Sequence, residues 1–151
     1  MRSLLRKLRL FRALPRSERL LLLEAAAALP LIACGLRLFG MQSFLASLER
    51  LAGRLARTDL CDDPAVRIAR TRWLVAAAAS NGLYRGTCLS RSTTLWWLLR
   101  RQGIASELRV GVRREGKALE AHAWIECGGV VVNERPETLE SYTPFGETLT
   151  R

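Results

Sequence analysis

The sequence predicts an α+β fold in which helices come first and a small antiparallel sheet follows. Up to about residue 102, apolar residues recur at intervals of three and four, which is the period of an amphipathic helix. From Glu107 onward the interval changes to two, as in strands, and the pair Gly128-Gly129 is typical of a tight hairpin turn. Helices followed by hairpin-linked strands are typical of the α+β class.

The composition fits a folded chain with a substantial core. Of the 151 residues, 49% are apolar and 25% are charged, which excludes a disordered tail and a fibrous repeat. We expect a division near residue 60, between an N-terminal helical, basic region over 1–60 and a second domain over 61–151.

The N-terminal region is expected to form two helices. Ser17 is a candidate N-cap for a helix that should run to Leu29 and could continue, kinked at Pro30, to Phe39. Over 41–57, apolar residues again repeat at three and four, with arginines on the opposite side. This pattern predicts a second amphipathic helix.

Two further helices are marked by signals at their ends. Asp63 can cap a helix that has Pro64 at its first position. Thr87 is the candidate N-cap of a helix that begins at Cys88, and Gly103 is its candidate stop. We therefore expect Cys88 in the first turn of a helix.

Three strands should follow as an antiparallel meander. They are expected over 107–112, 118–127 and 130–133, with the two glycines as the turn between the second and the third. The tail after Arg135 holds two prolines and a glycine and is expected to be irregular.

The net charge of +10 lies mostly in an N-terminal arm. Residues 1–19 hold seven basic residues and only one acidic residue, Glu18. A nucleic-acid-binding protein would spread its basic residues over a docking face with interleaved aromatic residues, so we expect no nucleic-acid partner. The arm could instead contact an acidic partner or the surface of an anionic membrane.

The apolar run over 20–36 raises the question of export. It follows a basic arm, as in a signal peptide, but Glu24 and Pro30 lie within it and the basic region before it is unusually long. It is also short for a membrane span and contains a carboxylate. We expect a buried or membrane-skimming amphipathic helix in a cytoplasmic protein.

The cysteines and the histidine limit the available chemistry. His122 is the only histidine in the chain. No CxxC motif occurs, so neither a disulfide framework nor a zinc ribbon is indicated, and no cofactor is expected. The four cysteines are Cys34, Cys61, Cys88 and Cys127.

Cys88 and His122 form the most informative pair. A thiol in the first turn of a helix faces free backbone N–H groups and the positive end of the helix dipole, which favour the thiolate form. An imidazole alongside can take the thiol proton and return it to a leaving group, while a third polar side chain orients the ring. This pattern favours nucleophilic catalysis.

Four segments carry a family resemblance: CLSRS at 88–92, LWWLLRRQGI at 95–104, ELRVGV at 107–112 and AHAWIE at 121–126. They resemble the transglutaminase-like leader peptidases of lasso-peptide biosynthesis. The resemblance implies a papain/transglutaminase-like cysteine protease fold. It also implies that the leader of a ribosomally made precursor peptide is removed before an ATP-using cyclase closes the ring. Because no separate recognition domain is evident, we expect a partner protein to recognise the leader.

The resemblance assigns roles to individual residues. Cys88 would be the nucleophile and His122 the general base. The family usually has Asn-Asp after the hairpin where this chain has Asn133-Glu134, so Glu134 would replace the Asp.

Strand register leaves two candidates for the third residue. A two-residue turn would put Asn133 diagonal to the imidazole, whereas a three-residue loop that includes Cys127 would put Glu134 opposite His122. We favour Glu134, because a carboxylate both orients the imidazole and stabilises the imidazolium. Asn133 is the neutral alternative.

Other functions remain open. Acyl transfer to an amine could use the same triad. A non-catalytic adaptor or membrane-surface module would bind through the basic N-terminus and leave the thiol inert. A zinc site of Cys88, His122 and Cys127 is disfavoured, because residues five apart on a strand point to opposite faces. For Cys127 we expect a packing role, and for Arg91 either an ion pair or a substrate contact.

Overall fold

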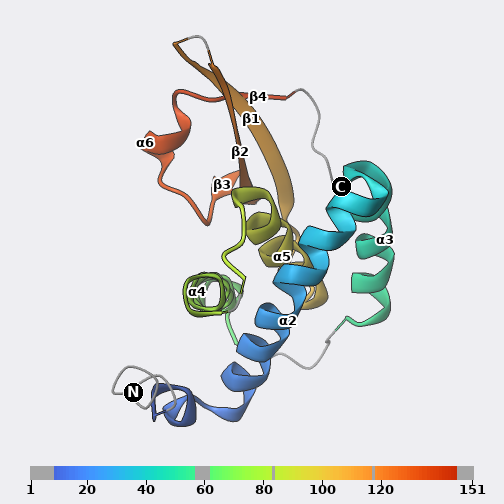
Figure 1. The fold of residues 1–151 in the computed structure, drawn as a ribbon. Coiled ribbons are helices and arrows are strands. Elements are labelled where there is room, and N and C mark those ends of the chain that lie inside the picture. Colours follow the sequence, from blue (N-terminus) through green and yellow to red (C-terminus); the bar gives the residue numbers. More distant parts are fainter. Residues whose placement is uncertain (1–8, 57–61, 83, 117, 146–151) are drawn as a thin grey trace.

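A computed structural model describes residues 9–56, 62–82, 84–116 and 118–145. It confirms the α+β class and the order of helices before sheet (Figure 1). Residues 9–13 are helical and precede the other elements. These are α2 (Arg16–Phe39), α3 (Met41–Arg54), α4 (Pro64–Asn81), α5 (Cys88–Arg101), β1 (Glu107–Glu115), β2 (Ala118–Cys127), β3 (Val130–Val131), α6 (Pro136–Leu139) and β4 (Thr143–Pro144).

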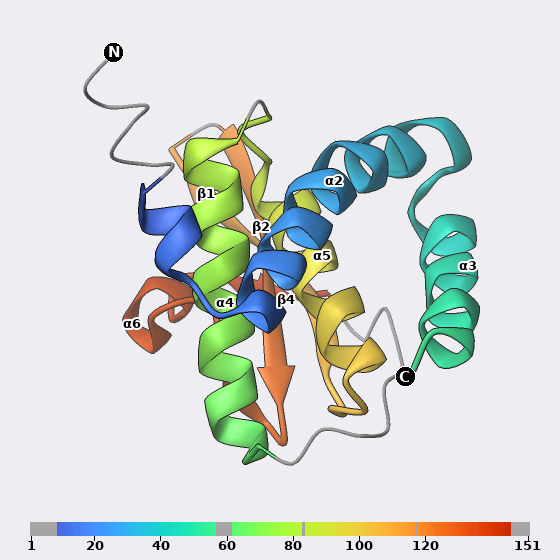
Figure 2. The ribbon, with the colours of Figure 1, turned by 90° about the horizontal axis from the view of Figure 1, so that it is seen from below.

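Helix α5 lies at the centre of the molecule. It contacts α2, α3 and α4, and it also packs against β1 and β2 of the sheet (Figures 1 and 2). Because it has neighbours on nearly every side, it buries polar as well as apolar side chains, among them Thr93, Thr94 and Trp96. The Trp96 indole N–H donates to the Ser106 carbonyl at 3.2 Å, which satisfies its polar group in the core.

One apolar cluster joins the N-terminal helices to the rest of the chain. It includes Leu29 of α2, Leu45 of α3, Leu99 of α5 and Ile125 of β2. The boundary expected near residue 60 falls at residues 57–61, outside the described residues, and it stays a prediction.

Helix α2 begins and continues differently from the sequence expectation. The N-cap position is held by Pro15 and no side chain caps the helix, so Ser17 as N-cap is wrong. Pro15, with its fixed φ and an extended ψ, places the N-cap two residues earlier, and the Arg19 N–H bonds to the Pro15 carbonyl at 3.0 Å. Pro30 lies inside the helix without ending it. Gly35 lets α3 approach, since a side chain there would overlap the Phe44 ring.

The expected signals at the ends of α4 and α5 are confirmed. Asp63 accepts from the Ala65 N–H at 3.1 Å, with Pro64 at the first helical position. Thr87 caps α5 by accepting from the Ser90 N–H at 3.3 Å. Gly103 ends α5 with a φ of 72°, in the left-handed region that favours glycine.

The sheet has the strand order β3-β2-β1-β4 and is antiparallel throughout. Its β2–β3 turn is the two-residue Gly128-Gly129 hairpin, in which both residues have positive φ. Three expectations need correction. The first strand continues to Glu115 rather than ending at Val112. The third strand ends at Val131 rather than at Asn133, and the tail expected to be irregular contains α6 and β4. Strand β4 pairs with β1 through Gly111–Pro144 and Val112–Thr143.

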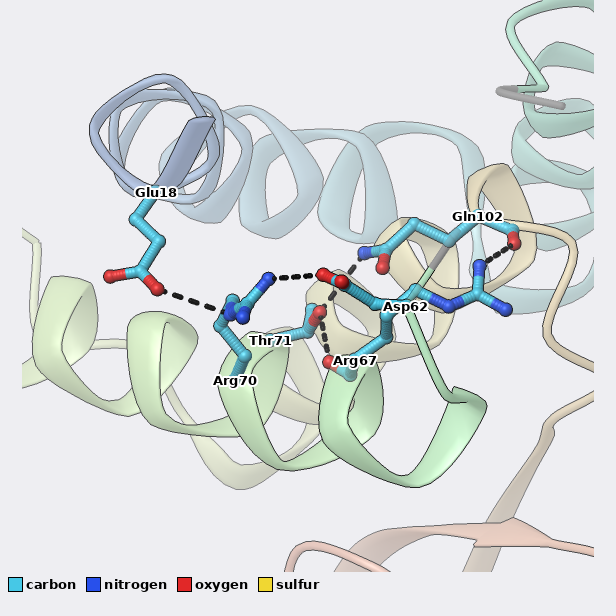
Figure 3. Close-up of polar contacts among 6 residues, drawn as sticks. All are labelled: Glu18, Asp62, Arg67, Arg70, Thr71 and Gln102. Atoms are coloured by element: carbon cyan, nitrogen blue, oxygen red, sulfur yellow. Dashed lines mark hydrogen bonds and ion pairs between the residues drawn. The ribbon is translucent and has the colours of Figure 1, made fainter. Parts of the chain in front are cut away.

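A polar network fixes the start of α4 (Figure 3). Arg70 bridges Glu18 of α2 at 3.1 Å and Asp62 at 2.8 Å. Arg67 donates to the Gln102 carbonyl at 2.7 Å, and the Gln102 amide donates to Thr71 at 2.9 Å. These contacts connect α4 with α2 and with the end of α5.

The outer face of α2 is unusually apolar for an exposed surface. Its large exposed side chains are Leu20, Leu23, Leu31, Leu38 and Phe39, which are 54–70% exposed. Among the described helices, α2 alone is long and apolar enough to cross a membrane, by length and composition only, with a mean hydropathy of 1.8.

Candidate active site

A cavity of about 80 Å³ lies where α4, α5, β2 and the loop after β3 meet. Cys88, His122, Asn133 and Glu134 all contribute to its walls. The structure therefore brings all the sequence-predicted site residues to one place. The other lining residues are Arg72, Val75, Ala76, Arg91, Ser92 and Leu95.

Cys88 is the first residue of α5 and is partly buried. Thr87 takes two of the backbone donors in the first turn, since its side chain binds the Ser90 N–H and its carbonyl binds the Arg91 N–H. Within the described residues, the N–H groups of Cys88 and Leu89 have no hydrogen-bond partner. The thiol thus sits beside two free donors at the positive end of the α5 dipole.

His122 projects from β2 and meets a carboxylate. Its Nε2 atom lies 3.2 Å from Oε1 of Glu134, and the two side chains are 19% and 29% exposed. This contact does not have the alignment of a hydrogen bond, and Nε2 has no hydrogen-bond partner among the described residues. The Tyr142 ring packs near the imidazole, with 5.5 Å between ring centroids.

The carboxylate beside His122 comes from a loop rather than from a paired strand. With the two-residue turn observed, strand pairing would have favoured Asn133, but pairing stops at Val131. The Asn133 amide is occupied elsewhere: it accepts the Ile125 N–H at 2.7 Å and donates to Ser92 at 2.9 Å. Glu134 is therefore the residue that reaches His122.

A glycine opposite the histidine makes room for the tail. Gly111 pairs with His122, and a Cβ there would lie 2.8 Å from the Trp124 ring and 3.0 Å from the Thr143 carbonyl. The missing side chain lets β4 approach β1. This approach brings the chain that carries Tyr142 close to the imidazole.

Two arginines contribute positive charge at the cavity. Arg72 donates to the Val132 carbonyl at 3.2 Å and so holds the loop that carries Glu134. Arg91 is exposed and lines the same cavity. A guanidinium at the mouth of a cavity can bind a carboxylate or a carbonyl oxygen.

Of the other cysteines, Cys34 and Cys127 do not line this cavity. Cys127 packs against the apolar core, and burial raises the pKa of its thiol. Cys34 is exposed on α2, and Cys61 is outside the described residues. Within the described part of the chain, no three His, Cys, Asp or Glu side chains lie close enough together to hold a metal ion.

Sequence reasoning missed several contributors to the site. In the sequence, Ser92 was notable only as part of the CLSRS motif. No sequence pattern predicted its hydrogen bonds to β2 and to Asn133. Arg72 and Val75 are three residues apart on α4. Residues at this spacing share one face of a helix, and both side chains line the cavity. Tyr142 belongs to the tail, where no pattern predicted a strand.

Comparison with known families agrees with this architecture. The family model of the Transglutaminase-like superfamily matches residues 28–147. The chain belongs to the transglutaminase-like superfamily, whose members usually are cysteine proteases or acyltransferases. The fold is accordingly of the papain-like α+β type. No curated protein and no solved structure matched the chain.

Proposed function

We propose that this protein is a cysteine peptidase in which Cys88 is the nucleophile, His122 the general base and Glu134 the residue that orients it. One observation carries the proposal: the His122–Glu134 pair, 3.2 Å apart, shares a cavity wall with a thiol at a helix start. A reactive cysteine needs these three groups in one place.

The reaction would proceed through an acyl-enzyme. His122 accepts the Cys88 proton, and the sulfur attacks the scissile carbonyl carbon. The free N–H groups of Cys88 and Leu89 then stabilise the resulting oxyanion. As the C–N bond breaks, the imidazolium gives its proton to the leaving amine and a thioester remains. Water, deprotonated by His122, then hydrolyses the thioester and restores the thiol.

For the substrate we propose the leader region of a lasso-type precursor peptide, cut in the cytoplasm before an ATP-using cyclase closes the ring. The support is the resemblance of the segments around Cys88 and His122 to lasso leader peptidases. Transfer of the acyl group to an amine would use the same residues, so product mass distinguishes it from hydrolysis.

We further propose that a separate leader-recognition protein docks on a second surface, the α2–α4 groove. This apolar hollow of about 550 Å³ lies between residues 10–14, α2 and α4, and Leu10, Leu23 and Trp73 contribute to its lining. Arg9 and Arg12 beside it are exposed and have no ion-pair partner among the described residues. Apolar walls with unpaired arginines fit an acidic amphipathic segment.

The catalytic proposal is tested by intact-mass analysis of a candidate precursor incubated with the protein and its recognition partner. Wild type should release the leader as a free acid, whereas Cys88→Ala and His122→Ala should release none. Cys34→Ala is the matched control and should act as wild type does, because Cys34 is exposed on α2 away from the cavity. Leader release by Cys88→Ala would overturn the proposal.

The docking proposal is tested by partner binding. Charge reversal at Arg9 and Arg12, or Trp73→Ser, should weaken binding by about tenfold or more. Leu119→Ser, at a side chain 74% exposed on β2, is the control and should leave affinity unchanged. If the groove variants bind the partner with unchanged affinity, the docking proposal is wrong.

The second candidate function is a non-catalytic membrane-surface module. The observation that favours it is the exposed apolar face of α2, with Arg16 near one end and Arg37 near the other. It predicts salt-sensitive binding to vesicles of anionic lipid and an inert Cys88. The membrane-surface module would be favoured over the peptidase if Leu31→Ser abolishes vesicle binding while Cys88→Ala binds vesicles as wild type does.

A further inference from the structure

A hydrogen-bonded bridge connects the three segments that carry the proposed triad. The Ser92 hydroxyl donates to the Ala123 carbonyl at 2.8 Å and accepts from the Asn133 amide at 2.9 Å. The Asn133 amide oxygen accepts the Ile125 N–H at 2.7 Å. Two side chains thus join α5, β2 and the loop after β3.

Each part of the bridge lies close in sequence to one of the proposed triad residues. Ser92 follows Cys88 by four residues, so both lie on one face of α5, and both line the cavity. Ala123 directly follows His122, and Asn133 directly precedes Glu134. Because Ser92 is only 1% exposed, water does not compete freely for its hydrogen bonds.

The Asn133 side chain also explains where strand pairing stops. The Val132 N–H still bonds the Ile125 carbonyl at 3.0 Å, as in a strand. The Ile125 N–H, on a residue that is fully buried, is then satisfied by the Asn133 side chain instead of a backbone carbonyl. The chain can therefore leave the sheet here and turn Glu134 toward the imidazole.

We infer that Ser92 and Asn133 are positioning residues, which set the geometry between the Cys88 thiol, the His122 ring and the Glu134 carboxylate. This inference rests on the proposed peptidase function. It also excludes Asn133 as the third triad residue, since both ends of its amide are engaged in the bridge.

The test is a double-mutant cycle of Asn133→Ala and Glu134→Gln. The first readout is the rate at which iodoacetamide alkylates Cys88 near neutral pH, resolved by mass spectrometry; the second is precursor cleavage. Each single variant should slow Cys88 alkylation about tenfold, and the double variant should be no slower than the slower single one. The inference would be overturned if the rate reductions of the two single variants multiply in the double variant, or if Cys88 is alkylated at the wild-type rate in Asn133→Ala.

A second variant decides the matter if Asn133→Ala does not fold. Asn133→Asp has the same shape and keeps the acceptor for the Ile125 N–H but loses the donor to Ser92. A bridge predicts slower alkylation and cleavage, whereas a third triad residue at Asn133 predicts equal or faster rates, because a carboxylate orients imidazole well. Ser92→Ala should resemble Asn133→Asp.

The control is Ser47→Ala, which removes an exposed hydroxyl on α3 and should change neither readout. Alkylation needs no precursor, so the inference and the proposed function fail separately. Slower alkylation in the bridge variants without any cleavage by wild type would count against the peptidase alone.

Discussion

Among single residues, Glu134 shows how a loop can complete a site that begins on regular elements. Cys88 is fixed by a helix and His122 by a strand, but Glu134 reaches the imidazole only because β3 ends at Val131. The Glu134 carboxylate lies 3.2 Å from Nε2 of His122. In the proposed reaction it would favour the ring orientation and stabilise the imidazolium that forms when the thiol is deprotonated.

Replacing Glu134 with glutamine should therefore impair catalysis more than folding. Glu134→Gln keeps the size of the side chain but removes its charge, and we expect kcat to fall by at least about 100-fold. Cleavage kinetics of the precursor measure this. Glu137→Gln, an exposed neighbour on α6, should stay within about twofold of wild type. Equal rates for the two variants would show that Glu134 has no part in the reaction.

Cys127 should show the opposite behaviour to a catalytic thiol. Burial raises the pKa of its thiol, so at a given pH less of it is thiolate than in an exposed cysteine. Its alkylation should accordingly become fast only at a higher pH than that of an ordinary free thiol. A pH series of iodoacetamide labelling, resolved by residue, measures this. Labelling of Cys127 as fast as that of an ordinary free thiol at every pH would contradict the packing role.

At the scale of elements, the sequence predicts what local signals control. Asp63 and Thr87 cap their helices as expected, because an N-cap depends on one side chain and the next few backbone N–H groups. Strand β4 and the early end of β3 depend on partners far away in sequence: Gly111 for the tail, and Ser92 for the loop. No local pattern could have predicted those contacts.

Two glycine substitutions should have opposite effects on stability. At Gly111, which faces His122 across the ladder, an alanine Cβ would press on the Trp124 ring, so Gly111→Ala should cost about 1–3 kcal/mol. Gly53 lies on α3 in open space, so Gly53→Ala should add about 0.5–1 kcal/mol through better helix propensity. Chemical denaturation measures both. A destabilised Gly53→Ala or a neutral Gly111→Ala would contradict the packing described.

Over the whole molecule, α4 separates two surfaces with different chemistry. Arg72 and Val75 line the cavity with Cys88, whereas Trp73 and Ala77 line the α2–α4 groove. Successive residues of a helix point in different directions, so one helix serves both surfaces. A partner in the groove would leave the cavity open to a substrate, which is what presentation of a precursor by a recognition protein requires.

Leu10, Phe11 and Leu14, in the described part of the N-terminal arm, line this second surface. Sequence composition predicted a contact region for an acidic partner or a membrane, and the structure adds an exposed apolar face on α2 and a hollow beside it. Which of the two occupants binds could not be predicted from sequence, because charge and apolar exposure favour both.

The most direct test of the central claim is competitive labelling of all four cysteines in one sample near neutral pH. The account predicts that Cys88 reacts at least about tenfold faster than Cys34, and that His122→Ala removes this advantage. If Cys88 reacts no faster than Cys34, or keeps its advantage without His122, then the cavity does not hold an activated nucleophile and the peptidase account is wrong.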